Sequence, residues 1–369
     1  MAKHPKICMI VQHPLVKGGI AAVVGGYRGS ILENDYQVRY VESYMDGDKY
    51  RKLFKAIAGY VDFLRVLLME KPELVHIHSS FGPSFYRKLP FIYMASWFKV
   101  PIINHCHGAD FDSFYINASP GKKKLVQKAY NKCTTMLALS TEWKERLSTI
   151  VQHERIEVIE NYSRIHEDAI QERANRSSNH QILFLGEIGQ RKGCYDIPAV
   201  VERVARKFPS VKFVLGGSGD IESVRHALFE RGVEQHVLFP GWVRGEDKDR
   251  LLRESDIFFL PSYNEGMPMA ILDAMGYGMP VVSTCVGGVP KIVHDGKNGY
   301  ACKPGDVEKL SDALIKMLQN EELCRQYGDS SVNIVRQGYS FEGHINRLTR
   351  LYQYVLTANK NNQVGVLSE

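Results

Sequence analysis

The sequence predicts an α/β protein with two doubly wound parallel sheets in one chain. Short apolar segments with the character of strands alternate with helical segments along almost all of the 369 residues. The strands are apolar on both faces, which is typical of parallel sheets that helices cover on both sides. The alternation pauses once and restarts, and the chain exceeds the roughly 250–300 residues at which a single core stops growing.

The first half of the chain contains six expected strands with helices between them. Each strand is a short run rich in Ile, Val and Leu, and strand–helix alternation favours a parallel sheet. The expected strands are residues 7–12, 38–43, 74–79, 101–107, 135–140 and 156–161. The expected helices are residues 20–32, 52–70, 84–98, 123–132 and 141–151.

Residues 172–181 are polar and lack periodicity, so we expect a linker there. The next expected strands are residues 181–186, 212–217, 236–241, 257–262, 280–284 and 299–302. The accompanying helices are residues 197–207, 221–231, 248–255, 268–275, 289–293, 307–320, 321–336 and, last, 341–356. The predicted domains are residues 1–170, residues 171–339 and a C-terminal helix with its tail at residues 340–369. Ligands of such sheets bind beyond the carboxyl ends of the strands.

Composition excludes several classes of protein. We expect no secretory leader, because residues 1–4 are polar and lead straight into the first expected strand. No apolar run of the sequence approaches the ~18 residues of a membrane span. The seven cysteines are scattered without a C-x-x-C pair, which disfavours a zinc cluster or a disulfide framework. We therefore expect a cytoplasmic protein.

The net charge of +6 is concentrated in the first half of the chain. Residues 1–165 hold 23 basic and 15 acidic residues, with basic clusters at residues 49–55 and 122–132. Such asymmetry indicates an anionic partner, although a plain solvated face is equally compatible with it. No recognised nucleic-acid motif accompanies the charge, so we expect no nucleic-acid partner.

The most informative segment is residues 260–282, which places Glu265 and Asp273 on either side of a loop-to-helix junction. Pro268 suits the first helical turn, because the N–H that it lacks would be unpaired there. Free N–H groups at a helix start bind anions or sugar hydroxyls. This segment could therefore hold a phosphorylated, polyhydroxylated ligand between two carboxylates.

Two further segments after strands favour phosphate binding. Gly18 and Gly19 open the first helix, where glycine permits a close approach to the backbone. Arg191 and Lys192 follow a strand, and fixed cations at a strand end suit a diphosphate. A plain glycine turn and an exposed basic turn are the alternatives for these two segments.

Trp242 and Val243, followed by Arg244, come after another strand and could form a shelf for a nucleobase. Trp242 could equally be a core residue. In the same way Gly287 and Gly288 precede a helix and could contact a phosphate or an acceptor.

Histidines lie near the ends of two strands of the first half. His107, followed by Gly108, could hydrogen-bond a substrate hydroxyl. His105 and His107 supply only two ligands from one strand with no clear third, so we predict no metal site. His76 and His78 are interpreted as structural.

Taken in order, these motifs resemble the retaining GT-B glycosyltransferases of family 4, which use nucleotide-sugar donors. The resemblance covers nearly the whole chain and is most specific in EGMPMAILDAMGYGMPVV, residues 265–282. It rests also on Gly18-Gly19, on HGAD at residues 107–110, on GEIGQRKG at residues 186–193 and on the VGGVPKIV segment. It implies two Rossmann-like domains facing a cleft, with the nucleotide held mainly by the second. It also implies a C-terminal helix that crosses back to pack on the first domain.

The resemblance implies roles for individual residues. Glu265 matches a glutamate beside the donor sugar, and Asp273 matches the residue that binds the ribose hydroxyls. Lys192 matches the lysine that neutralises the diphosphate, His107 contacts the donor sugar, and Gly19 lies in the loop that faces the phosphates.

Gly266 and Met267 match positions whose backbone touches the sugar, and with Pro268 they form the helix start expected to stabilise the leaving group. The chain also departs from the family pattern. Asp273 replaces the usual glutamate, which shortens the reach to the ribose.

A second departure is Glu187, which stands where the family commonly has an arginine on the diphosphate. We hypothesise that Arg191, from the same loop, compensates for it.

We therefore predict a retaining hexosyltransferase with His107, Lys192 and Glu265 as its catalytic residues. It would move sugar from a nucleoside-diphosphate donor, UDP favoured over GDP, to a lipid-linked saccharide in capsule, exopolysaccharide or O-antigen (lipopolysaccharide) synthesis. No cofactor is required, because the protein supplies the cations. The alternatives are a non-catalytic binding or scaffold protein with this fold, which Glu187 favours, and a nucleotide-sugar epimerase.

The amphipathic, basic residues 50–70 and the basic, apolar residues 84–99 suit an anionic membrane surface. We therefore expect peripheral contact with the inner face of the cytoplasmic membrane.

Overall fold

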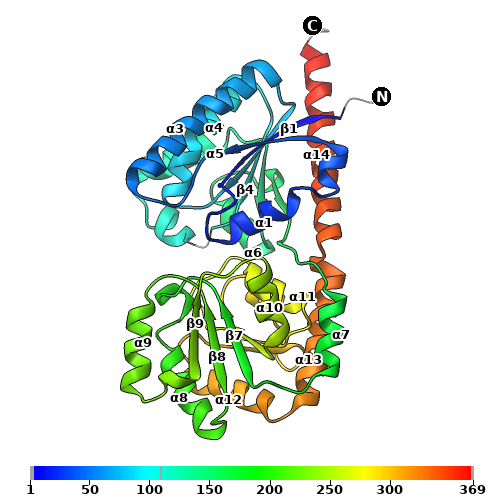
Figure 1. Ribbon diagram of the computed structural model, residues 1–369. Coiled ribbons are helices and arrows are strands. Elements are labelled where there is room, and N and C mark those ends of the chain that lie inside the picture. Colours follow the sequence, from blue (N-terminus) through cyan, green and yellow to red (C-terminus); the bar gives the residue numbers. More distant parts are fainter. Residues whose placement is uncertain (1–3, 109, 367–369) are drawn as a thin grey trace. The chain divides into compact units, whose positions relative to one another are not determined.

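The chain forms two compact units in the computed structural model, which describes residues 4–108 and 110–366, with side chains as far as residue 361 apart from residue 360 (Figure 1). Unit 1 takes in the chain as far as Asn161 and again from Glu342 onward, and unit 2 is Tyr162–Phe341. These breaks lie near, but not at, the predicted ones after residues 170 and 339.

Unit 1 is built on a six-stranded sheet in the order β2-β1-β3-β4-β5-β6. Every neighbouring pair is parallel, which confirms the predicted doubly wound architecture. The strands are β1 (Lys6–Val11), β2 (Gln37–Glu42), β3 (Leu74–Ser79), β4 (Ile102–Cys106), β5 (Thr135–Ala138) and β6 (Ile156–Val158).

Helices cover both faces of this sheet. In Figure 1, α3, α4 and α5 lie on one side of the sheet and α14 lies on the other. The helices are α1 (Gly19–Tyr27), α2 (Leu32–Asp35), α3 (Lys49–Arg65), α4 (Pro83–Trp97), α5 (Pro120–Tyr130), α6 (Thr141–Ser148) and α14 (Phe341–Val366). Tyr352 of α14 is buried and lies 2.6 Å from Nδ1 of His76 on β3, so the C-terminal helix packs on the first sheet as predicted.

Unit 2 repeats this plan with the strand order β12-β11-β10-β7-β8-β9, and again all pairs are parallel. The strands are β7 (Gln181–Leu185), β8 (Lys212–Gly216), β9 (Val237–Gly241), β10 (Ile257–Leu260), β11 (Val281–Thr284) and β12 (Gly299–Cys302). The helices are α7 (Glu167–Asn175), α8 (Ile197–Lys207), α9 (Ile221–Glu230), α10 (Glu246–Glu254), α11 (Met269–Gly276), α12 (Val307–Leu318) and α13 (Glu321–Ile334).

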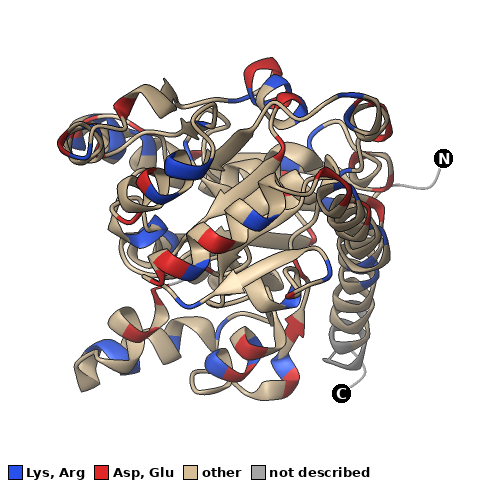
Figure 2. Cartoon of the chain, turned by 90° about the horizontal axis from the view of Figure 1, so that it is seen from below, with Lys and Arg blue, Asp and Glu red and all other residues tan. Residues whose placement is uncertain are grey.

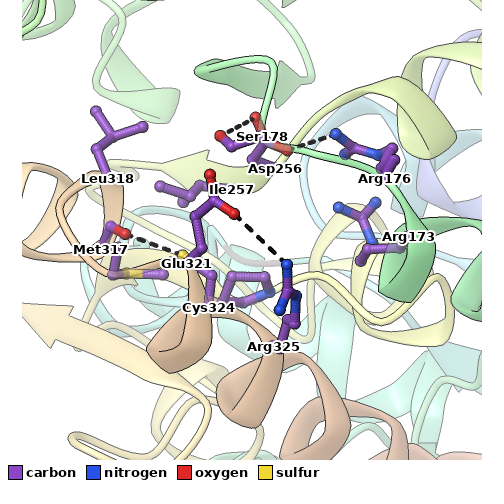
Figure 3. A pocket seen from close by; sticks show the side chains of 11 residues that line it. Arg173, Arg176, Ser178, Asp256, Ile257, Met317, Leu318, Glu321, Cys324 and Arg325 are labelled. Carbon is purple, nitrogen blue, oxygen red and sulfur yellow. Dashed lines mark hydrogen bonds and ion pairs between the residues drawn. The ribbon is translucent and has the colours of Figure 1, made fainter.

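The predicted linker at residues 172–181 is wrong in its first part, because α7 continues to Asn175. Arg173 of α7 donates to three main-chain carbonyls at distances of 2.5–3.1 Å, and Arg176 lies 2.7 Å from Asp256 (Figure 3). Polar side chains thus anchor this helix near the amino ends of the strands. A search for apolar periodicity misses such a helix, because it buries little apart from Ala169.

Two smaller expectations also differ from the structure. The helix expected at residues 289–293 is a single 3₁₀ turn, Val289–Lys291. The last helix begins at Phe341 as expected but runs on to Val366. None of the helices described has both the length and the hydropathy that a bilayer crossing requires.

Candidate functional site

The carboxyl edge of the unit 2 sheet is built from loops that glycines allow to pack closely. Gly193 has a φ of 70°, and a Cβ there would overlap the carbonyl of Pro261. Gly287 has a φ of 52°, and a Cβ there would overlap the carbonyl oxygen of Glu265. The loops after β7, β10 and β11 are therefore in contact because both positions lack a side chain.

Glu265 is the centre of this edge, and it is only 5% exposed. Its Oε1 lies 2.5 Å from Nζ of Lys192 and accepts a 2.6 Å hydrogen bond from Ser262 Oγ. Its Oε2 lies 3.9 Å from Nη1 of Arg191. A buried carboxylate needs such partners, because removing an isolated charge from water is costly.

Arg191 lies between two carboxylates. Its Nη2 is 3.4 Å from Glu187 Oε2, and its Nη1 donates to the carbonyl of Asn264 at 3.3 Å. The unusual Glu187 is thus paired with an arginine of its own loop. The same guanidinium lies beside Glu265, so Arg191 contacts both carboxylates, and its compensation for Glu187 stays a prediction.

The helix start after Glu265 differs slightly from the expectation. Helix α11 begins at Met269, and Pro268 is its N-cap in an extended conformation rather than a residue of the first turn. No side chain caps this end. Gly288 N donates to the carbonyl of Gly266 at 2.7 Å, so the glycine pair after β11 supports the loop, while the Met267 side chain is buried.

Asp273 is held by a residue that the sequence analysis did not single out. Its Oδ2 lies 2.5 Å from Nζ of Lys248 on α10. Asp273 is the fifth residue of α11, so it lies just over one turn into the helix. Lys248 is distant in sequence and belongs to no motif, so only the packing of α10 beside α11 shows the pair. Ser262 was also missed, although it lies three residues before Glu265.

The predicted nucleobase shelf lies at the end of β9. Trp242 is half-buried and is therefore not a core residue. Val243 lies over the carboxyl end of β8, because a Cβ on Gly216 would come within 3.0 Å of its Cγ2. Both residues thus follow strand ends on the edge that carries Glu265.

Gly18, Gly19 and His107 belong to unit 1. Gly18 is the N-cap of α1 with a φ of 135°, and Gly19 is the first residue of that helix. His107 Nε2 lies 2.9 Å from Nδ1 of His78, and burial lowers the pKa of His107 to about 3. His107 is therefore a neutral imidazole that can offer its Nδ1 to a ligand.

The residue after His107 must be glycine, because a Cβ on Gly108 would lie 2.8 Å from the backbone nitrogen of Phe81. Ala109 of the HGAD motif lies outside the described residues.

Two six-stranded parallel sheets, each flanked by helices, are the architecture of the GT-B glycosyltransferases. The family described as "Glycosyl transferases group 1" matches residues 166–332, and "Glycosyltransferase Family 4" matches residues 21–162. The two matches together span most of the chain, which therefore belongs to the family 4, or group 1, glycosyltransferases.

Relatives of this family act in several pathways. N-acetyl-alpha-D-glucosaminyl L-malate synthase of Bacillus anthracis is 23% identical over 274 residues, which cover 72% of this chain and 71% of that one. The amylovoran biosynthesis glycosyltransferase AmsK of Erwinia amylovora is 29% identical over 156 residues, or 40% of this chain and 38% of that one. Among solved structures, Anabaena HepE in complex with UDP and glucose has a TM-score of 0.72 at 17% identity, covering 95% of this chain and 100% of that one.

Proposed function

We propose that the protein is a retaining hexosyltransferase that takes sugar from a UDP-sugar and transfers it to a saccharide acceptor in polysaccharide synthesis. The observation that carries this proposal is the buried Glu265, held by Lys192 and Ser262 beside the open start of α11. The pathway class is supported by relatives such as the amylovoran enzyme, and a UDP donor by the structural likeness to HepE with UDP.

In this proposal the site works by electrostatic stabilisation of the leaving diphosphate. Lys192 and Arg191 supply cations, and the N-terminus of α11 supplies N–H groups, where negative charge grows in the transition state. The two oxygens of Glu265 already face these cations and Ser262, so we assign it to holding a sugar hydroxyl rather than to nucleophilic attack. The departing phosphate would then deprotonate the acceptor on the same face, and no metal ion would be needed for the transfer.

His107 and Asp273 complete the proposed donor contacts. The low pKa of His107 keeps its imidazole neutral, so it would hydrogen-bond a sugar hydroxyl rather than act as a cation or an acid. Asp273 would accept from the ribose hydroxyls while Lys248 fixes the carboxylate. Trp242 and Val243 would flank the base.

The donor and the stereochemistry can be tested without knowing the acceptor. Thermal shifts measured with UDP, GDP and ADP sugars identify the donor, because a ligand that binds only the folded state raises its stability. Slow donor hydrolysis followed by NMR then gives the first-formed anomer. We expect a UDP-sugar to bind and the α-anomer to form first from an α-linked donor. A β-anomer formed first would contradict retention, and a shift with GDP sugars alone would contradict the UDP assignment.

The alternative of a non-catalytic protein rested on Glu187. Because Arg191 pairs with Glu187, that carboxylate does not face a diphosphate uncompensated. Family membership makes the protein a glycosyltransferase, and no contact of the described residues favours a scaffold or an epimerase.

The proposed acceptor is lipid-linked, because α3 and the turn after it expose an apolar stripe to solvent. This stripe consists of Tyr50, Leu53, Phe54, Ile57, Val61, Leu64, Leu68 and Met69. The spacings of three and four residues place these side chains on one face, and Phe54, Val61 and Met69 are 72%, 64% and 69% exposed. The opposite face of α3 buries Ala56 and Phe63 against the rest of unit 1. The helix therefore has a second apolar face that is exposed to water, and such exposed patches mark sites of interaction.

The charges around the apolar stripe favour an anionic lipid surface. Along the chain as a whole, Lys and Arg alternate with Asp and Glu, as the colours of Figure 2 show. Helix α3 has a basic excess of its own, with Asp62 as its single acidic residue. Its basic residues are Lys49, Arg51, Lys52, Lys55 and Arg65. Basic residues that flank an apolar face are typical of helices that lie in the bilayer interface.

Vesicle co-sedimentation tests this docking. We expect binding to phosphatidylglycerol vesicles that weakens with salt and is lost in a Phe54→Ser, Val61→Ser double variant. Phe229→Ser is the matched control, because Phe229 is 71% exposed on α9 of unit 2. Equal sedimentation of the double variant and the control would contradict docking through the stripe. Equal binding to neutral phosphatidylcholine would contradict the anionic requirement.

A further inference from the structure

Three histidines lie buried together on one face of β3 and β4. His76 and His78 on β3 and His105 on β4 are each 0% exposed. The two strands are neighbours with His78 opposite His105, and alternate residues of a strand share a face. The three imidazoles therefore point to the same side, and one nitrogen from each lies within 4.8 Å of the others.

Only some of the ring nitrogens of this cluster have a hydrogen-bond partner among the described residues. His76 and His78 each have Nδ1 engaged, by the Tyr352 hydroxyl at 2.6 Å and by His107 Nε2 at 2.9 Å. Their Nε2 atoms, and both ring nitrogens of His105, have no hydrogen-bond partner among the described residues. Buried polar atoms are nearly always paired, so four unpaired nitrogens on three neighbouring rings point to a ligand-binding site.

An imidazole with one nitrogen held and the other bare is the arrangement of a metal-binding histidine. The held nitrogen fixes the orientation of the ring and leaves a lone pair on the other nitrogen for the ion. A tyrosine hydroxyl and a second imidazole perform that role for His76 and His78. His105 offers either of its unpaired ring nitrogens as the third ligand, so an ion can take one nitrogen from each of the three rings.

We propose that His76, His78 and His105 bind a divalent transition-metal ion of the zinc class inside unit 1. This proposal revises the sequence-based prediction of no metal site, which considered only His105 and His107 on one strand. Zinc–nitrogen bonds of about 2.0–2.1 Å in a tetrahedral site put the nitrogens about 3.4 Å apart. The nitrogens, which lie within 4.8 Å of one another, therefore have to approach by up to about 1.4 Å when the ion binds.

The ligand set also selects the kind of ion. Imidazole nitrogen suits zinc, copper, nickel and iron, whereas calcium and magnesium require oxygen ligands. With three protein ligands the fourth position would hold a water or a hydroxide, and hydroxide would offset part of the ionic charge. The ion would join β3 to β4 and fix His78, which touches His107. The metal site itself does not depend on the proposed transferase mechanism.

Metal content of the full-length, tag-free protein tests the proposal. After purification in zinc-supplemented medium and dialysis, we expect about one equivalent of a transition metal by elemental mass spectrometry. EDTA should lower the Tm, added zinc should restore it, and cobalt should give the visible bands of a tetrahedral site. In His105→Leu, which breaks no hydrogen bond of the cluster, we expect all of these signals to be lost.

His226→Gln is the matched control, because His226 is an exposed histidine of unit 2 and should leave the metal content unchanged. Less than about 0.1 equivalent in the wild type, with no Tm response to zinc, cobalt, nickel or copper, would overturn the proposal even if His105→Leu failed to fold. Equal metal in wild type and His105→Leu would place the ion elsewhere and overturn it as well. None of these readouts uses transferase activity, so failure of the proposed function would not be mistaken for failure of the metal site.

Discussion

We predict that replacing Arg191 by alanine lowers kcat/KM, and the contacts of its guanidinium give the size of the loss. Its guanidinium lies 3.4 Å from Glu187 and 3.9 Å from Glu265, at the edge where a diphosphate is proposed to bind. Loss of one donor to a developing oxyanion in a protected site costs about 2.7–4 kcal/mol. The Arg191 side chain is 38% exposed, so solvent screening reduces this to about 1.5–3 kcal/mol. Since about 1.4 kcal/mol is a factor of ten, Arg191→Ala should lower kcat/KM by about 10- to 150-fold.

A double-mutant cycle with Glu187 separates compensation from a general loss of charge. In the Arg191→Ala background Glu187 is left unpaired beside the diphosphate, so Glu187→Ala should recover part of the lost kcat/KM. In the wild-type background the same change should have a small effect, because Arg191 already offsets the carboxylate. Steady-state kinetics with the donor found by thermal shift provide the measurement, and circular dichroism checks the fold.

The control for this cycle is Arg231→Ala, which removes an arginine paired with Glu202 at 2.7 Å on the surface of unit 2. We expect its kcat/KM to stay near that of the wild type. If Arg191→Ala also stays within about twofold of the wild type, the compensation argument is wrong, whatever the other variants do.

Two further predictions concern stability. Gly287→Ala should destabilise unit 2 by at least about 2 kcal/mol in urea unfolding, because φ is 52° and the new Cβ would overlap the Glu265 carbonyl. Gly25→Ala in α1 meets nothing within 4 Å and should be neutral or slightly stabilising, and equal effects of the two would refute the packing argument. Burial lowers the pKa of His344 to about 4, so the unfolded chain takes up its proton near pH 6.5 and the folded chain does not. The free energy of unfolding should therefore decrease by up to about 1.4 kcal/mol per pH unit as the pH is lowered from 6.5 towards 4. A His344→Gln variant whose free energy of unfolding depends on pH as steeply as that of the wild type would contradict this assignment.

Much of the fold could be predicted because the strands carry their signal locally. Segments such as KICMIV of β1 and IFFL of β10 are apolar runs bounded by polar residues, and their burial in parallel sheets confirms that interpretation. Helix α7 was missed because its stability comes from contacts that are distant in sequence. Arg173 binds main-chain carbonyls about 80 to 100 residues away, and no local pattern reports such contacts.

The site residues likewise fall into those that local sequence patterns predict and those that depend on contacts distant in sequence. The loop that carries Glu265 and the basic turn with Lys192 could be predicted, because both follow strands and ends of parallel strands meet at one edge. The partner of Asp273 could not, because Lys248 reaches it only through the packing of α10 beside α11. The histidine cluster required the strand order, which places β3 next to β4 although a helix separates them in the chain.

If unit 2 binds a diphosphate as proposed, the pairing of Glu265 with two cations explains how the proposed site can be kept in place when no donor is bound. Lys192 and Arg191 would repel each other across a small, partly buried loop without a carboxylate between them. Glu265 removes that cost, and Ser262 holds its Oε1 in place, so the cations stay positioned where the phosphate is proposed to bind. On this proposal a donor would compete with Glu265 for Lys192, and the competition would weaken binding of the donor in the ground state. Charge that develops on the leaving phosphate strengthens its hold on Lys192, so this competition favours the transition state over the bound donor.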